Sequence, residues 1–363
     1  MSGLRYGWTT GACATAATTA AYTALLSGEF PDPVEITLPK DKHPSFALAR
    51  EALGDGWAMA AIVKDAGDDP DVTHGALITS TIRPGAPGSG VTFRAGPGVG
   101  TVTKPGLPLP VGEPAINPVP RRLMAGHIAE VAARHGGTGD VVVEISVEGG
   151  AELALKTWNP RLGILGGLSI LGTTGVVVPY SCSAWIDSIR RGIDVARAAG
   201  HPHVAGCTGS TSEQVASTLY GLPDDALLDM GDFAGAVLKY LRRHPIPRLT
   251  IVGGIGKLSK LADGHLDLHS GRSQVNLTLL ATLAAEAGAP PDLIPQIKSA
   301  NTALHALRLC QAATIPLGDL VATRAQNTAR IVLTGAPVSV DIIVIDRAGT
   351  IVGRSPTHLN EAR

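Results

Sequence analysis

Three glycine-rich loops between residues 172 and 257 could bind an anion or a ribose through their backbone amides. Such loops expose N–H groups near the positive end of a helix, where a carboxylate or phosphate is favoured. The alternative is that glycine only makes the tight turns between strands and helices. The loops are Gly206–Ser210, Gly253–Lys257 and Gly172–Gly175. Our candidate cofactor-binding residues are Gly206, Thr208, Gly209, Ser210, Gly253, Gly254, Gly256 and Lys257, with Asp229 after a neighbouring apolar run.

The Gly253–Lys257 loop fits neither of the two common nucleotide-binding motifs. A phosphate-binding Walker loop would need glycine at Ile251 and a serine or threonine at Leu258. A dinucleotide-binding fingerprint would need glycine where Ser259 stands. A nucleotide triphosphatase and an ordinary dehydrogenase are therefore disfavoured.

His265, Asp267 and His269 alternate along the chain, so an extended backbone would place all three side chains on one face. A histidine oriented by an aspartate can move a proton near neutral pH, and the same residue types can bind a metal. The alternative is a loop in which these side chains cap backbone groups. We predict a catalytic role for the three residues and no metal bound by the protein.

The first half carries polar residues that could bind an anionic substrate. Thr9, Thr10 and Gly11 lie at a predicted helix start, where they either bind an anion or simply cap the helix. The turn Lys64–Asp71 holds four aspartates and is either a cation or substrate site or a solvated turn. Arg121 and Arg122 form either a carboxylate clamp or ordinary surface. The full set of candidate substrate contacts is Thr9, Thr10, Gly11, Asp65, Asp68, Lys104, Arg121, Arg122, Thr173 and Thr174.

The elements that must position these residues fall into two patterns. Residues 1–150 predict an α+β domain, with helices at Thr10–Ser27 and Pro120–His135 and a Gly/Pro-rich passage from Arg94 to Pro120. The strands predicted there are Val34–Leu38, Trp57–Lys64, Ala76–Ile82, Val91–Arg94 and Val141–Val147.

Residues 151–335 alternate apolar runs with helical stretches, which predicts an α/β domain with a mostly parallel, Rossmann-like sheet. Residues 336–363 contain a last strand, Val338–Ile345, which could return to the first domain. The apolar runs are Leu162–Leu165, His203–Ala205, Ala226–Asp229 and Leu249–Val252. The helices are Ser183–Ala199, Ser212–Tyr220, Asp232–His244, Ser273–Ala287 and Thr302–Ala312.

Composition limits the function classes. A net charge of −1 gives no broad basic field for nucleic acid. The most hydrophobic long stretch, Gly163–Val178, is too short and too rich in glycine for a membrane span. Four cysteines without metal-binding spacing and the lack of a signal peptide indicate a cytoplasmic protein. The sequence leaves open whether the protein forms a homo-oligomer.

Seven blocks of the sequence together resemble the cobalt-precorrin-5B C(1)-methyltransferase (CbiD-type) family. They run in order over nearly the whole chain, which is more specific than any single loop. Val178 stands where the family is expected to have a basic residue, and Leu268 where threonine is usual. The blocks are Gly7–Cys13, Val63–Asp71, Gly98–Leu107, Ala115–Arg121, Gly166–Gly175, Gly206–Gly209 and Gly253–Leu261.

The resemblance implies transfer of a methyl group from S-adenosyl-L-methionine to C-1 of cobalt-precorrin-5B, giving cobalt-precorrin-6A in anaerobic cobalamin biosynthesis. The substrate implied is a small tetrapyrrole, and its cobalt arrives with it. Two alternatives remain: a corrinoid-binding carrier without methyl transfer, and another anion-handling α/β transferase.

Overall fold

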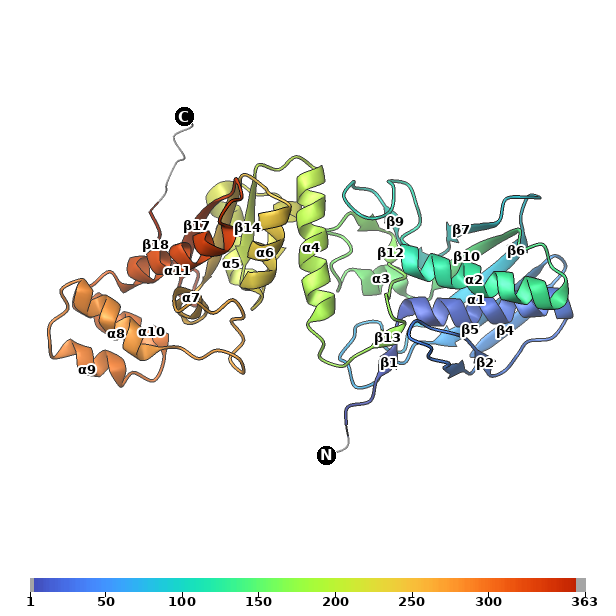
Figure 1. Ribbon diagram of the computed structural model, residues 1–363, viewed down its shortest axis with the longest axis horizontal. Helices are drawn as coiled ribbons and strands as arrows, with labels where there is room; N and C mark the ends of the chain where they lie inside the picture. Colours follow the sequence, from blue (N-terminus) through green and yellow to red (C-terminus); the bar gives the residue numbers. More distant parts are fainter. Residues whose placement is uncertain (1–2, 357–363) are drawn as a thin grey trace. The chain divides into compact units, whose positions relative to one another are not determined.

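The computed structural model describes residues 3–356 and divides into two compact units, Met1–Cys182 and Ser183–Arg363 (Figure 1). This boundary corrects the predicted one at residue 150. The segment after residue 150 stays with the first unit because its strands pair there: β11 (Ile164–Leu165) with β9 (Thr101–Val102), and β12 (Gly167–Leu168) with β8 (Gly98–Val99).

A five-stranded sheet in the order β4-β5-β6-β10-β7 forms the frame of the first unit. All neighbours are antiparallel except β10 and β7, which run parallel. The alternating burial of β10, with Val141, Val143, Ile145 and Val147 buried, shows that one face of the sheet packs on the core. The strands are β4 (Arg50–Gly54), β5 (Trp57–Val63), β6 (Leu77–Pro84), β7 (Val91–Ala95) and β10 (Val141–Val147).

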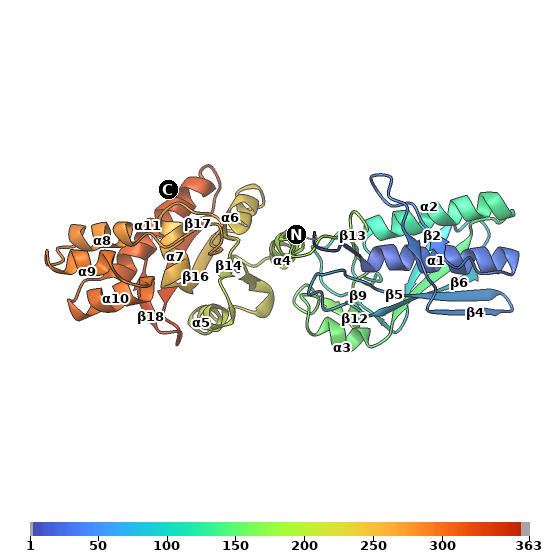
Figure 2. The ribbon, with the colours of Figure 1, turned by 90° about the horizontal axis from the view of Figure 1, so that it is seen from below.

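Helix α1 (Thr10–Ser27) lies against that sheet beside α2 (Pro118–His135), as Figures 1 and 2 both show. Its alanines and threonines are small enough for close packing, and its buried hydroxyls are satisfied locally. Thr15 and Thr19 each donate to the carbonyl four residues earlier, at 2.8 Å. The Thr18 and Ser80 hydroxyls bond each other at 2.8 Å between helix and sheet. The buried hydroxyls of Thr15, Thr18 and Thr19 therefore all have hydrogen-bond partners.

Short elements complete the first unit around the glycine-rich segments. The 2-residue strand β1 pairs with β13, and β2 with β3. They are β1 (Gly7–Trp8), β2 (Val34–Glu35), β3 (Ser45–Phe46), β13 (Val176–Val177) and the helix α3 (Gly150–Ala154).

The second unit is built on a sheet in the order β15-β14-β16-β17-β18. The first four strands are parallel, and β18 is antiparallel at the edge, so this sheet is mixed as well. The predicted combination of helices and sheets in both halves is confirmed. The strands are β14 (His203–Cys207), β15 (Leu227–Asp229), β16 (Arg248–Gly254), β17 (Ser339–Ile345) and β18 (Ile351–Arg354).

Strand β17 corrects a second expectation, because it joins the second unit's sheet instead of returning to the first domain. It pairs with β16 over seven residues, from Ser339 opposite Arg248 to Ile345 opposite Gly254. All of its residues after Ser339 are buried, as the centre of a covered sheet requires.

Helices cover both faces of this sheet. Helix α5 (Ser210–Tyr220) packs on one face, and α4 (Ser183–Ala198), α6 (Ala234–Arg243), α7 (Ile255–Ala262) and α11 (Leu317–Leu333) share the core on the other (Figure 2). Alternate residues of β16 point to opposite faces of the sheet, so Ile251 lies in one core and Val252 in the other. The remaining helices are α8 (Leu277–Glu286), α9 (Leu293–Lys298), α10 (Ala303–Ala312) and the 3₁₀ turn Asp224–Ala226.

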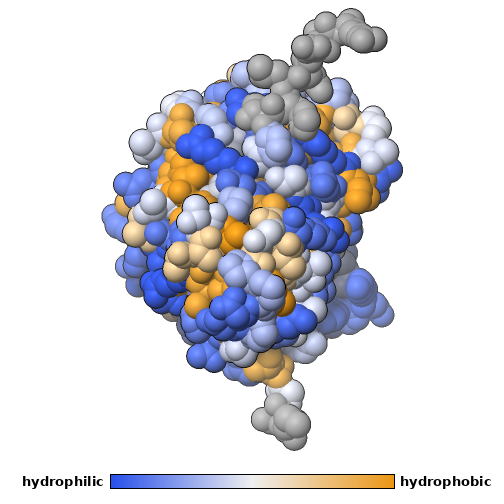
Figure 3. Space-filling view, turned by 90° about the vertical axis from the view of Figure 1, so that its left-hand side faces the viewer, coloured by the Kyte–Doolittle hydropathy of each residue, from blue (hydrophilic) through white to orange (hydrophobic). Residues whose placement is uncertain are grey.

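On the face that Figure 3 shows, hydrophobic side chains form several separate groups among hydrophilic ones. Such scattering is ordinary for a protein surface. Among residues 3–356, no helix has both the length and the apolar character that a bilayer crossing requires.

We predict that Gly353→Ala destabilises the second unit by about 1–3 kcal/mol or more. A Cβ on Gly353 would lie 2.1 Å from the carbonyl carbon of Gly318, so α11 and β18 would have to separate. Denaturant unfolding measures the loss. The control is Gly256→Ala in α7, where a Cβ meets nothing within 4 Å; an equal loss in both variants would show that the close approach is unimportant.

Candidate functional site

A cavity of about 840 Å³ lies at the carboxyl edge of the second unit's sheet. The segments that leave β14, β16 and β17 border it, because parallel strands end on the same edge. The residues lining it are Thr208–Ser212, Gly254–Lys257, Lys260, Ser270, Gln274, Val275, Leu277, Asn301–Leu304 and Ile345–Arg347.

The first two loops present helix N-termini to this cavity. After β14 the chain turns at Gly209 into α5, and the Ser212 hydroxyl donates to the Gly209 carbonyl at 2.6 Å. After β16 the chain turns at Gly254 directly into α7. Neither Gly209 nor Gly254 has a side chain that could cap its helix, so neither residue supplies an acceptor for the first backbone N–H groups.

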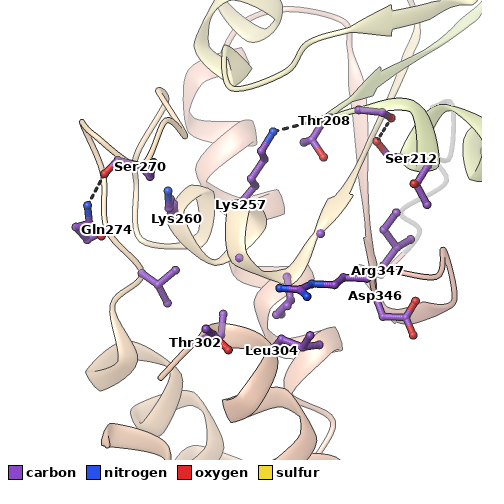
Figure 4. Close-up of a pocket in the computed structure, with 18 of the residues that line it drawn as sticks. Thr208, Ser212, Lys257, Lys260, Ser270, Gln274, Thr302, Leu304, Asp346 and Arg347 are labelled. Carbon is purple, nitrogen blue, oxygen red and sulfur yellow. Dashed lines mark hydrogen bonds between the residues drawn. The ribbon is translucent and has the colours of Figure 1, made fainter. Parts of the chain in front are cut away.

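Lys257 ties these loops together. Its ammonium donates to the Thr208 carbonyl at 3.0 Å (Figure 4). The same ammonium lies 3.1 Å from Oδ1 of Asp232. Oδ1 of Asp232 is buried and makes no hydrogen bond of good geometry, so the Lys257 charge is what compensates it. The backbone of Asp232 in turn accepts from Leu268, which anchors the 266–273 segment beside the cavity.

The other side of the cavity is formed by α10 and by the turn after β17. Thr302 caps α10 by accepting from the His305 N–H at 3.1 Å. Asp346 uses Oδ1 to accept from the N–H groups of Ala348 and Thr350, each at 2.9 Å. The side chain of Arg347 extends from this turn toward the start of α10, near Thr302 and Leu304 (Figure 4).

This arrangement suits a small polar ligand. The volume lies within the range of about 300–1,000 Å³ that is usual for small-molecule sites. Backbone amides, hydroxyls and three cationic side chains converge on it from separate elements, and apolar side chains such as Val275, Leu277 and Leu304 line it beside them.

The structure brings most of the predicted cofactor residues together here: Thr208, Gly209, Ser210, Gly254, Gly256 and Lys257 line the cavity. Gly206, Gly253 and Asp229 do not. Gly206 lies inside β14, and the missing side chain of Gly253 makes room for Thr208, whose methyl carbon would be 2.7 Å from a Cβ there. Asp229 ends β15, next to β14 on the side away from β16.

Sequence reasoning missed Asp346 and Arg347. They follow directly after the predicted strand Val338–Ile345, so the signal was present. Because that strand was expected to return to the first domain, its end was not placed beside the other strand ends. The capping residue Thr302 was likewise recognisable, as the first residue of a predicted helix.

His265, Asp267 and His269 do not form the acid–base unit that the spacing predicted. His265 lies 3.7 Å from Asp263, and the His269 ring accepts from the Gly271 N–H at 3.1 Å. Asp267 accepts from the backbone N–H of His269 and pairs with Arg272 at 2.6 Å.

Asp267 is also a poor base. Burial opposes its ionisation, but the Arg272 guanidinium and the His269 N–H outweigh burial and lower its pKa. The segment is therefore a hydrogen-bonded clasp around buried Leu268, whose carbonyl accepts from Lys260 at 2.8 Å. None of the three predicted residues lines the cavity.

In the first unit, the predicted anion site at the start of α1 is occupied by the protein itself. The Thr9 hydroxyl caps the helix by accepting from Ala12, and the Gly11 N–H donates to the Leu171 carbonyl at 2.9 Å. Thr10 is buried and its hydroxyl accepts from the Leu171 N–H. Helix capping therefore accounts for these residues. Thr174 bonds its own turn, and Thr173 is exposed.

Arg121 and Arg122, the predicted carboxylate clamp, lie in different environments. Arg121 donates to the carbonyls of Ile116 and Pro114 and pairs with Glu113 at 2.9 Å, so its guanidinium holds the Gly/Pro-rich segment in place. Arg122 is exposed. Lys104 is half-buried, and its aliphatic stem lies against Gly163.

The acidic turn Lys64–Asp71 is an internal network. Hydrogen bonds from Arg5 reach Asp65 and Asp68, and the bond to Asp65 lowers the pKa of that carboxyl. Lys64 is only 2% exposed and pairs with Asp71 at 2.7 Å. These contacts favour the interpretation of the segment as a structural turn over that of a cation site.

Within residues 3–356 no group of three or more His, Cys, Asp or Glu residues is arranged to hold a metal ion. Cys13, Cys207 and Cys310 are buried, and burial raises the pKa of the Cys13 thiol to about 12. That thiol is therefore protonated at neutral pH and unsuited to nucleophilic chemistry.

Fold and cavity together define a two-unit α/β protein with a polar pocket at the strand ends of its second unit. Residues 1–179 match the family model described as CbiD, and residues 267–356 match the model described as CbiD, C-terminal domain. The first match ends close to the structural boundary after Cys182. The chain belongs to the CbiD family.

Named relatives are similar over nearly their whole length. Proteins named cobalt-precorrin-5B C(1)-methyltransferase from Brucella anthropi and Brucella suis are 65% and 64% identical, over 97% of this chain and 95% of theirs. A solved structure of a cobalamin biosynthesis protein (CbiD) from Archaeoglobus fulgidus is 26% identical. That match covers 68% of this chain and 76% of that chain with a TM-score of 0.39.

We predict that Asp71→Asn destabilises the first unit by about 3 kcal/mol at neutral pH, because Lys64 would keep a buried charge without its partner. Burial opposes ionisation of Asp71, but Lys64 and Thr73 outweigh it and lower its pKa. A lowered pKa gives stability above the unfolded value, about 3.9, that is lost as the pH falls through the folded value.

Denaturant unfolding at pH 7 and at acid pH tests this. The difference between wild type and variant should be full at pH 7 and shrink below about pH 4. Asp55→Asn, in an exposed turn, is the matched control and should change little. A loss at pH 7 no larger than the control's would mean that the ion pair contributes nothing.

Proposed function

We propose that this protein transfers a methyl group from S-adenosyl-L-methionine to C-1 of cobalt-precorrin-5B, giving cobalt-precorrin-6A in cobalamin biosynthesis. The relatives named for this methyltransferase share about two thirds of its residues over the whole chain. The single structural observation that supports the proposal is the polar cavity at the ends of β14, β16 and β17. We propose further that the enzyme acts in the cytoplasm and that its only metal is the cobalt of the substrate.

The cavity is the proposed donor site, used in the manner of a Rossmann-like strand edge. S-adenosyl-L-methionine combines a nucleoside with a charged amino acid, and the cavity offers matching groups. Hydroxyls of Thr208, Ser210 and Thr302 and open helix amides can bond ribose and purine. Gly256 borders open space, because nothing lies within 4 Å of its Cβ position. A larger side chain at this position would therefore enter the cavity.

The sulfonium donor supplies an electrophilic methyl group, so the protein's main contribution is alignment. Orientation of two reactants can lower a barrier by several kcal/mol, with about 7–11 as the upper range. The Lys257 bridge to Thr208 and Asp232 keeps the two lining loops that hold Thr208 and Lys257 in a fixed arrangement. We assign Lys257 as a positioning residue on this basis. The acid–base role that the sequence suggested for His265, Asp267 and His269 is not retained.

Cobalt-precorrin carries several carboxylates, which arginine and lysine side chains can bind. Of the predicted substrate contacts in the first unit, Arg122 and Thr173 are exposed and can serve this purpose. Arg121 and Asp65 are engaged within the fold, so we do not propose them as substrate ligands.

Calorimetric titration separates this function from its alternatives. We predict that the purified protein binds S-adenosylhomocysteine, and that neither ATP nor NAD competes, because the loop sequence lacks both nucleotide motifs. A corrinoid carrier would bind the tetrapyrrole without binding S-adenosylhomocysteine. Competition by ATP at similar affinity would support a nucleotide-using transferase and contradict the proposal.

Gly256→Leu should weaken S-adenosylhomocysteine binding at least about tenfold, because the new side chain would occupy cavity volume without disturbing the core. The matched control is Gly126→Leu in α2, another helical glycine whose Cβ position meets nothing within 4 Å. Circular dichroism should show both variants folded. Unchanged affinity in Gly256→Leu would place the donor elsewhere.

A further inference from the structure

The charges around the cavity do not balance. Its lining contains three cations, Lys257, Lys260 and Arg347, and one carboxylate, that of Asp346. Lys257 is compensated by Asp232 at 3.1 Å. Lys260 is 7% exposed and donates to the Leu268 carbonyl, but no carboxylate in the described residues pairs with it. The cavity lining therefore carries an excess of positive charge.

Arg347 is the cation most open to a ligand. Its residue is exposed, and its guanidinium forms no ion pair or hydrogen bond with any described residue. The adjacent Asp346 forms no ion pair with it, since the Asp346 carboxylate accepts hydrogen bonds from the backbone of its own turn. Arg347 thus extends into the cavity with all of its donors available.

Two helix N-termini add to this positive environment. Helix α7 begins at Ile255 with no side-chain cap at Gly254, and α10 begins at Ala303. Both starting segments line the cavity together with Arg347. A guanidinium beside two positive helix ends is electrostatically unfavourable unless an anion joins them.

We propose that Arg347 binds the carboxylate of the donor's methionine moiety. This inference rests on the proposed function, since it names the residue that recognises one part of that donor. A planar guanidinium can bond both oxygens of a carboxylate at once, which a lysine cannot do. Lys260 has already directed one donor to Leu268, and Lys257 is held by Asp232, so neither is as free to turn toward the ligand.

The test compares two ligands that differ by the proposed contact. S-adenosylhomocysteine carries the amino-acid carboxylate, and 5′-methylthioadenosine keeps the nucleoside and sulfur without it. Arg347→Gln should weaken S-adenosylhomocysteine binding by about 10- to 100-fold, the range for a lost charge-assisted contact. Binding of 5′-methylthioadenosine should stay the same. Because both ligands are measured on the same variant, a loss of folded protein would affect them equally and cannot imitate the result.

Two control variants make the test specific. Arg354→Gln, at an exposed position of β18 in the same hairpin, removes an arginine outside the cavity and should leave both affinities unchanged. Lys260→Gln keeps a donor for the Leu268 carbonyl and should affect the two ligands alike. If Lys260→Gln instead of Arg347→Gln weakens S-adenosylhomocysteine selectively, Lys260 binds the carboxylate and the inference is overturned.

Failure of the inference is distinguishable from failure of the proposed function. If wild-type protein binds neither ligand, the donor assignment itself is contradicted. If wild-type protein binds S-adenosylhomocysteine and Arg347→Gln weakens both ligands equally or neither, the donor assignment stands and the role of Arg347 is contradicted.

Discussion

The parallel pairing of β14, β16 and β17 is the constraint on which the proposed site depends. Because the three strands run in the same direction in adjacent positions, their carboxyl ends meet at one edge. The chain must leave that edge through loops, and two of those loops lead directly into helices α5 and α7. Uncapped helix amides and the Arg347 turn are thereby brought to one cavity from positions more than 130 residues apart in the sequence, such as 209 and 347.

A second principle explains why many polar residues that looked functional serve the fold. A buried or half-buried charge is costly unless it is paired, so the chain supplies partners from nearby segments. Arg121 pairs with Glu113 and donates to two backbone carbonyls, and Lys64 pairs with Asp71. At the cavity, by contrast, Arg347 has no partner among residues 3–356. The difference between satisfied and unsatisfied charge, more than residue type, marks the candidate site.

Local patterns in the sequence predicted most individual elements. The Ala/Thr-rich run predicted α1, and the alternating apolar residues of 141–147 predicted β10. Pairing between distant segments was harder, because a parallel strand carries no local signal of its neighbour. The end of β17 was therefore misplaced, and with it Arg347. The apolar run 162–165 was likewise assigned to the wrong half, since its partner is β9 in the first unit.

The alternation of His265, Asp267 and His269 shows a related limit for the site. Spacing predicted a shared face, but the chain folds into a turn in which each side chain bonds a different neighbour. The glycine loops were more informative because their role follows from backbone geometry, and six of the eight predicted loop residues line the cavity: Thr208, Gly209, Ser210, Gly254, Gly256 and Lys257. The glycine loops therefore predicted the cavity lining better than the spacing of His265, Asp267 and His269 predicted a shared site.

We propose that the methyl donor binds at the strand ends of the second unit. Hydrogen–deuterium exchange with and without saturating S-adenosylhomocysteine tests it most directly, because ligand contact slows exchange of the covered amides. We expect protection in peptides that span residues 208–212, 254–260, 301–304 and 345–347, with the sheet of the first unit unchanged. Protection confined to residues 3–182, with none in these four segments, would contradict it.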